Sequence, residues 1–196
     1  MVKELTKGDT EHMPEKPSVV MENFEYVDLP AMRFIGKDVM ASGPEAGQKY
    51  GEMWGQSAAF MPILDGMAAY ATVITDPCAL MHHDNKAHTE PMHYIVGKFM
   101  KADTPVPEGL DYCDIPACSV AMSIVCGEFN DMIGKIYVMT RDKILADGKK
   151  VPYPSGYFHA EIYVKENIPQ GGVVSKLGYL FVCCNDGEEK QGRAIG

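Results

Sequence analysis

The order of apolar and polar segments along the chain repeats once. The segment Tyr-Val-Asp-Leu-Pro-Ala at 26–31 recurs as Tyr-Cys-Asp-Ile-Pro-Ala at 112–117, 86 positions later (112 − 26). An apolar, strand-like run follows each copy, at 32–35 and at 118–125, and a glycine with an acidic residue close behind follows each run. A segment with helical periodicity then begins in both cases. A short match followed by the same order of elements indicates an internal duplication.

Helical periodicity is the next feature that the two halves share. The i, i+3, i+4, i+7 spacing of an amphipathic helix relates these positions of the first half: Tyr50, Met53, Trp54, Ser57, Phe60 and Met61. The same spacing relates these positions of the second half: Phe129, Met132, Ile133, Ile136, Tyr137 and Ile144. Gly148 is suited to end that second helix. In the first half Pro62 and the Asp-Gly pair at 65–66 interrupt the pattern, which predicts a short helix and a loop for 61–75.

Two strand-like segments close each half. They lie at 78–82 and 92–99 in the first half, and at 158–164 and 178–184 in the second. The order in each half is therefore strand, strand, helix, strand, strand. We predict an α+β fold of duplicated β-α-β-β units with pseudo-twofold symmetry, in which helices cover one face of two antiparallel sheets.

One domain accounts for most of the 196 residues. We place it at 20–184, with repeats at about 20–102 and 108–184 that are joined by a segment containing Pro and Gly. Residues 1–19 and 185–196 are polar and without periodicity, so we expect flexible tails there. No apolar run approaches the length of a membrane-spanning helix.

Net charge and cysteine usage narrow the function classes. The 18 Lys and Arg residues against 27 Asp and Glu residues give a formal charge of −9, which opposes direct binding to nucleic acid. Neutral or cationic small molecules fit this charge better. Five of the six cysteines lie in apolar runs, where a free thiol behaves as a small core residue, and the polar N-terminal segment has no signal-peptide pattern. We therefore expect a reduced, cytoplasmic protein.

The segment 158–164 carries the candidate site. Side chains of a strand alternate between its two faces, and we expect the helices to meet the apolar face, which holds Phe158, Ala160, Ile162 and Val164. The other face holds His159, Glu161 and Tyr163. A carboxylate beside a tyrosine on a face away from the core suits a ligand pocket, although a solvated strand face has the same composition.

Four stretches of the chain, taken in order, resemble the GyrI-like small-molecule-binding domain. They are His-His-Asp-Asn at 82–85, Met-His-Tyr-Ile-Val-Gly at 92–97, Asp-Ile-Pro-Ala-Cys-Ser-Val-Ala at 114–121 and Glu-Ile-Tyr at 161–163. That family comprises the effector-binding domains of AraC- and MerR-type multidrug regulators and stand-alone gyrase-inhibitor proteins. The resemblance covers roughly residues 20–184, and it implies paired copies that each contain a strand hairpin, with a ligand cleft between the halves.

The resemblance also implies a site with Glu161 at the base of that cleft. Tyr163, Trp54, Tyr94 and Tyr137 are the candidate aromatic walls, although Trp54 and Tyr137 also have the helical spacing of ordinary core residues. A ring face attracts a cation by about 0.5–2 kcal/mol. We therefore expect the chain to bind lipophilic, cationic or planar small molecules, as a multidrug-type binding or sensing protein for drugs or toxins.

The regulators of this family carry a helix-turn-helix region, and only a short polar segment precedes the first strand here. We therefore expect a chain that acts alone or as a partner subunit. Two alternatives stay open. Some stand-alone relatives hydrolyse strained electrophilic toxins, and Glu161 would then be the catalytic general base, with Tyr94, Tyr137 or His159 as second group. The other alternative is a protein-interaction module of gyrase-inhibitor type or a homodimer.

The histidines raise the question of a metal site. His82, His83, His88 and His93 are close in sequence, but their spacing matches no standard zinc motif and no C-x-x-C pair accompanies them. A chain rich in Met and His has axial haem ligands to offer, yet no motif marks one. We expect no metal and no cofactor.

Overall fold

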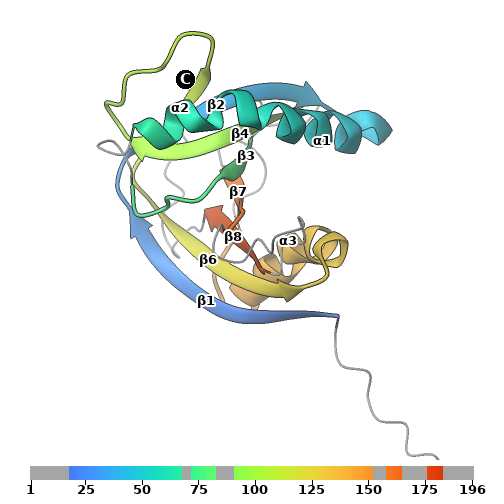
Figure 1. Ribbon diagram of the computed structural model, residues 1–196. Coiled ribbons are helices and arrows are strands. Elements are labelled where there is room, and N and C mark those ends of the chain that lie inside the picture. The colour runs from blue at the N-terminus through green and yellow to red at the C-terminus, as the bar shows by residue number, and fades with distance from the viewer. Residues whose placement is uncertain (1–17, 68–71, 83–90, 152–157, 165–175, 183–196) are drawn as a thin grey trace, which may run out of the picture.

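The computed structural model describes residues 18–67, 72–82, 91–151, 158–164 and 176–182. Its strands are β1 (Val19–Leu29), β2 (Met32–Ala41), β3 (Cys78–His82), β4 (Met92–Lys101), β5 (Asp111–Ile115), β6 (Cys118–Gly127), β7 (Phe158–Ile162) and β8 (Lys176–Val182). Its helices are α1 (Ala46–Gln56), α2 (Met61–Gly66) and α3 (Phe129–Ala146), with the short 3-10 helices η1 (Gly43–Glu45) and η2 (Ser57–Ala59). Figure 1 shows their arrangement. The predicted order of elements in each half is confirmed.

The strands form one continuous antiparallel sheet in the order β1-β6-β8-β7-β3-β4-β2-β5. The α+β fold is confirmed, but the two sheets that the sequence suggested are joined into one. The joint is the pairing of β3 with β7, where Leu80 lies opposite Ala160. Every residue of β3 is buried, because the strand is covered on both faces, and its sequence accordingly has no polar row.

The sheet has the pseudo-twofold symmetry that the repeat predicts. Exchanging each strand for its counterpart in the other copy (β1 with β5, β2 with β6, β3 with β7, β4 with β8) reverses the strand order and leaves it otherwise unchanged. The register agrees: Tyr26 lies opposite Ala121, and Tyr112 lies opposite Ile35. The second pair is the first pair with the two copies exchanged, because Tyr112 follows Tyr26 by 86 residues and Ala121 follows Ile35 by 86 residues (112 − 26 and 121 − 35). The duplication therefore extends to the hydrogen-bonded ladders.

The first strand of each copy pairs with the other copy. β1 pairs with β6 and β5 pairs with β2, although only Pro30 and Ala31 separate β1 from β2. A two-residue hairpin needs a positive φ at one or both turn residues, which Pro-Ala does not supply, and the residue before a proline is held extended. The chain therefore passes from Leu29 into the opposite half. The hairpins of the two copies are β3–β4 and β7–β8.

Sequence periodicity located the helices, but the first helical segment is divided. The positions from Tyr50 to Met61 are distributed over α1, η2, the turn residue Phe60 and α2, and α2 is the short helix expected there. α3 runs over 18 residues, and Gly148 follows its end with φ of 76°, a left-handed conformation that favours glycine. None of the helices in the described ranges is long and apolar enough to cross a membrane.

Apolar clusters cover both faces of the sheet. The first cluster lies between the sheet and the helices, and it includes Leu64 of α2 and Met132 of α3. The second includes Leu29 and Ile115 from the two edge strands together with the central strands, and no described helix residue belongs to it. The two edges contribute to one cluster because the sheet curls, as Figure 1 shows.

The apolar face of β7 is turned away from the helices, which corrects the expectation from the sequence. Phe158, Ala160 and Ile162 belong to the second cluster. Glu161 faces the helix-covered side, where it is hydrogen-bonded to Tyr94 of the first cluster. The prediction failed because the curl of the sheet buries the second face without any of the described helices, so an apolar strand face does not identify the helix side.

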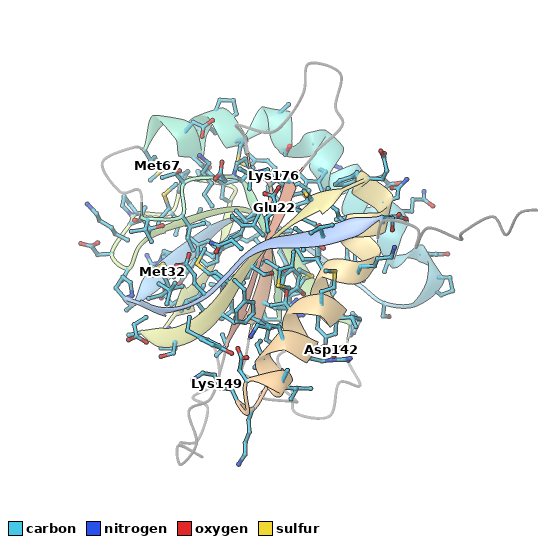
Figure 2. The ribbon with its side chains drawn as sticks, turned by 90° about the horizontal axis from the view of Figure 1, so that it is seen from below. Glu22, Met32, Met67, Asp142, Lys149 and Lys176 are labelled. Atoms are coloured by element: carbon cyan, nitrogen blue, oxygen red, sulfur yellow. The ribbon has the colours of Figure 1, made fainter. Side chains whose placement is uncertain are left out.

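An ion pair links the edge strand β1 to β8. Lys176, the first residue of β8, donates to Glu22 of β1 over 2.6 Å, and the two labels lie together in Figure 2. β1 and β8 are both neighbours of β6, so the ion pair spans the intervening strand. Both side chains are more than one-third exposed, so the contribution of the pair to stability is small.

We predict that Gly36 and Gly97 are required for the β2–β4 ladder. They lie opposite each other, and a Cβ atom on Gly36 would be 2.1 Å from the carbonyl oxygen of Val96. Gly36→Ala should lower the free energy of unfolding by about 3 kcal/mol or more, because backbone atoms would have to move. Gly51→Ala in α1, where an added Cβ meets nothing within 4 Å, should raise it by up to about 1 kcal/mol.

Urea denaturation followed by circular dichroism measures both variants. Equal stabilities of the two variants would contradict a close approach of β2 and β4 at this point.

Candidate functional site

Glu161 lies at the centre of the sheet on the helix-covered side. In β7 it is opposite Ala79 of β3 on one side and Tyr179 of β8 on the other. Only 9% of its surface is exposed. Alternation along the strand turns both of its neighbours, Ala160 and Ile162, into the second apolar cluster. The sheet thus holds a carboxyl group at a depth where acids are rare unless they are paired.

Two tyrosine hydroxyl groups donate to one oxygen of this carboxyl group. Tyr163, directly after β7, donates to Oε2 over 2.9 Å, and Tyr94 of β4 donates to the same oxygen over 3.4 Å. The indole N–H of Trp54 on α1 donates to the hydroxyl oxygen of Tyr94 over 2.9 Å. The backbone N–H of Tyr163 donates to the carbonyl oxygen of Pro77 and fixes the chain there. One chain of hydrogen bonds therefore leads from α1 through β4 to Glu161.

Aromatic rings surround these hydroxyl groups. Tyr50 stacks on Tyr94 with ring centroids 4.0 Å apart and an interplanar angle of 14°. Trp54 packs on Tyr163 at 4.2 Å, and Phe129 lies 6.4 Å from the same ring. Phe129 begins α3, so the rings near the carboxyl group come from helices of both copies.

A second group of rings follows β7 and β8 next to Glu161. The hydroxyl group of Tyr179 is hydrogen-bonded to Nδ1 of His159. Tyr137 of α3 packs on both rings, with centroids 5.8 Å from His159 and 6.2 Å from Tyr179. Phe181 stacks on His159 at 5.9 Å. Tyr137, expected as a wall around the acid, lies in this second group.

Burial raises the pKa of Glu161 above its ordinary value. The hydrogen bonds from Tyr163 and Tyr94 act in the opposite direction, because they stabilise the ionised form. Burial, followed by the charge of Glu161, also raises the pKa of both tyrosines, so their hydroxyl groups stay protonated. None of the ion pairs among the described residues includes Glu161. The acid is thus supported by neutral donors and by no described basic side chain.

Sequence reasoning named Glu161, the two tyrosines that donate to it, and Trp54, which contacts both tyrosines. It missed Tyr50 and Phe129, which it treated only as apolar positions of helical patterns. A signal existed for Tyr50, since it precedes Trp54 by four residues and therefore shares its helix face. No signal in the sequence places Phe129 beside Tyr163.

The symmetry of the sheet relates Tyr179 to Tyr94. Tyr94 in the β3–β4 hairpin and Tyr179 in the β7–β8 hairpin occupy the same position relative to the pairing of β3 with β7. The two tyrosines are therefore counterparts in the two copies. Met81 is the counterpart of Glu161 for the same reason: Met81 follows Leu80 in β3, and Glu161 follows Ala160 in β7, where these two residues pair. The duplication supplies two tyrosines to the centre of the sheet but one acid.

Two of the four histidines meet on the opposite face of the sheet. The rings of His82 and His93 are stacked with centroids 4.6 Å apart, and Nδ1 of His93 lies 2.5 Å from Oδ2 of Asp38. His83 and His88 lie outside the described residues. Within the ranges that the structure describes, no group of three His, Cys, Asp or Glu side chains is arranged to hold a metal ion.

No family model and no curated protein matches the sequence. Solved structures share its fold. SAV2435 bound to tetraphenylphosphonium matches with a TM-score of 0.62 at 8% identity, over 84% of this chain and 94% of that one. An integron cassette protein from the mobile metagenome of Vibrio cholerae gives 0.57 at 11% identity, over 86% and 100%. The C-terminal domain of EcmrR gives 0.50 at 16% identity, over 83% and 98%.

These similarities concern the fold. They agree with the GyrI-like fold that the four sequence stretches implied, and with the duplicated α+β architecture of the described residues. The shared sheet and helices place Glu161 between the two copies, and the chemistry of the site follows from the side chains of this chain.

We predict that Glu161→Gln stabilises the protein at neutral pH. Because the folded state raises the pKa of Glu161 above the ordinary value of 4.5, the folded state binds this proton more tightly than the unfolded chain does. The free energy of unfolding therefore falls as pH rises from the unfolded-state pKa to the folded-state pKa. Glutamine keeps an oxygen acceptor for the two hydroxyl groups and carries no charge. The variant should be more stable than the parent at about pH 7.5, and the difference should shrink towards pH 4.5.

Urea denaturation over a pH series measures this difference. Glu52→Gln, the same change on an exposed position of α1, is the matched control and should follow the parent at every pH. A Glu161→Gln variant less stable than the parent at neutral pH would mean that the tyrosine hydrogen bonds outweigh the cost of burial.

Proposed function

We propose that the chain binds lipophilic cations with planar or bulky aromatic groups at Glu161. The observation that carries the proposal is a carboxyl group exposed by only 9%, surrounded by aromatic rings and without a basic partner among the described residues. Charges buried in proteins are ordinarily paired or bound to a metal. An organic cation would supply the opposite charge, and its apolar groups would pack on the rings.

The energetics of such a site favour cations over neutral molecules of the same shape. Each ring face contributes about 0.5–2 kcal/mol to the binding of a cation, with the larger values in desolvated sites. A bound positive charge also lowers the pKa of a neighbouring carboxyl group, which offsets the burial that raises the pKa of Glu161. Because the site requires charge and apolar area rather than a detailed hydrogen-bond pattern, it would accept cations of several shapes.

Solved structures of the same fold support small-molecule binding as the class of function. SAV2435 was solved with tetraphenylphosphonium, and EcmrR, whose C-terminal domain matches this chain, was solved in a complex with DNA. For this chain we infer a drug- or toxin-binding or sensing role in which residues 20–184 form the binding unit and small molecules rather than nucleic acid are the direct ligands.

Fluorescence titration with tetraphenylphosphonium tests the proposal. Trp54, the single tryptophan, contacts Tyr163 and is hydrogen-bonded to Tyr94, so its emission reports on the site. We expect a saturable change in the parent protein. Glu161→Gln should weaken binding by about tenfold or more at neutral pH, because a desolvated charge pair is lost.

Glu52→Gln is again the matched control and should keep the parent's affinity. Equal affinities of all three proteins would contradict a role for Glu161 in cation binding. Absence of both a saturable fluorescence change and a heat of binding in the parent protein would contradict the proposed function itself.

A further inference from the structure

The direction of the hydrogen bonds that lead to Glu161 is fixed by chemistry. An indole N–H can only donate, so Trp54 makes the hydroxyl oxygen of Tyr94 an acceptor. The hydrogen of that hydroxyl group then goes to Oε2 of Glu161. Tyr163 donates its own hydroxyl hydrogen to the same oxygen. Two donors therefore converge on Oε2, and burial keeps both tyrosines protonated by raising the pKa of each.

The other carboxyl oxygen has a different environment. No described side chain is hydrogen-bonded to Oε1 of Glu161. A proton on Oε2 would point at two hydroxyl hydrogens, whereas a proton on Oε1 would meet no hydroxyl hydrogen of a described side chain. The neutral acid therefore carries its hydrogen on Oε1 while Oε2 keeps both tyrosine hydrogen bonds. The ionised acid presents only lone pairs at Oε1. Protonation thus converts Oε1 from an acceptor into a donor and leaves the tyrosines unchanged.

We propose that Glu161 selects between two ligand classes: lipophilic cations bind to its ionised form, and neutral lipophilic molecules with a strong hydrogen-bond acceptor bind to its protonated form through Oε1–H. This inference rests on the proposed function and adds the second ligand class to the same site. The aromatic rings of Tyr50, Trp54 and Tyr163 provide apolar contact to both classes. Whether Oε1 is a hydrogen-bond donor or an acceptor decides which class is bound.

The two classes must respond to pH in opposite directions. A cation favours the ionised acid, so its affinity rises with pH until the acid is fully ionised. A neutral acceptor requires the protonated acid, so its affinity rises as pH falls until protonation is complete. Each change approaches a limit of about tenfold per pH unit, as linkage to one proton requires.

Tetraphenylphosphonium and triphenylphosphine oxide are suitable probes. Both present aromatic rings around phosphorus, but the first is a cation and the second is neutral with a strongly accepting oxygen. Titrating the full chain with each probe from about pH 5 to about pH 8, by Trp54 fluorescence and calorimetry, should give affinity curves of opposite slope.

Glu161→Gln separates the two classes at one pH. The amide oxygen accepts from both tyrosines, and the amide N–H₂ takes the place of Oε1–H as a permanent donor. The variant should lose affinity for tetraphenylphosphonium by about tenfold or more, and it should bind triphenylphosphine oxide with the affinity of the protonated parent at every pH. Glu52→Gln should keep both slopes of the parent.

Tyr163→Phe is a second variant that keeps the acid. It removes one hydrogen bond that lowers the pKa of Glu161, so the midpoints of both curves should move together to higher pH. This shift is independent of whether Glu161→Gln folds, which circular dichroism checks.

The outcomes distinguish the two proposals. If tetraphenylphosphonium binding depends on Glu161 while triphenylphosphine oxide fails to bind, or binds independently of pH and of Glu161→Gln, the selection is overturned and the cation site stands. If neither probe binds the parent, the proposed function fails and the selection fails with it. Opposite slopes that disappear in Glu161→Gln would establish the selection.

Discussion

The pairing of β3 with β7 is the interaction on which the rest of the structure depends. It is the ladder that joins β1-β6-β8-β7 to β3-β4-β2-β5 in the middle of the sheet. Because the pseudo-twofold axis passes between Leu80 and Ala160, side chains beside this joint lie between the helices of the two copies. A residue of β7 that faces the helices is therefore reached by rings from α1 and from α3. The ring contacts of Tyr163 with Trp54 and with Phe129 show this convergence. A site between the copies follows directly from how the sheet is joined.

The scaffold is duplicated, but the polar chemistry is not. Tyr94 and Tyr179 are counterparts, and both direct their hydroxyl groups to β7, the first to Glu161 and the second to His159. The counterpart of Glu161 on β3 is Met81. A second acid beside the same joint would repel the first, and one of the two would be neutral at physiological pH. One acid on one central strand gives the site a single negative charge, and the symmetry of the sheet supplies it with apolar surroundings from both sides.

Local patterns in the sequence predicted local structure well. The six-residue match fixed the repeat at the offset that the ladders later showed, and periodicity located α3 and its end before Gly148. Strand alternation also placed Glu161 and Tyr163 on the same side of their segment. The pairing partners of the strands were not predicted. The Pro-Ala link after the first strand disfavours a hairpin with the next strand, but it does not indicate that β1 and β5 each pair with the other copy. The face of β7 that contacts the helices was predicted wrongly. Alternation assigns side chains to two faces, but it does not indicate which face the helices cover and which face the curl of the sheet buries.

Neutral donors stabilise the ionised form of the buried acid without pairing it with an opposite charge. A lysine or arginine beside Glu161 would stabilise its charge more strongly, but it would also cancel that charge. Tyr163 and Tyr94 donate hydrogen bonds without bringing a charge, and their raised pKa keeps them neutral. No described basic side chain thus compensates the charge, and its burial costs stability. Methionine occupies the equivalent position of β3, so the architecture itself does not require an acid there. The carboxyl group of Glu161 is therefore an addition to the fold rather than a requirement of it, and the proposed cation binding gives it a role.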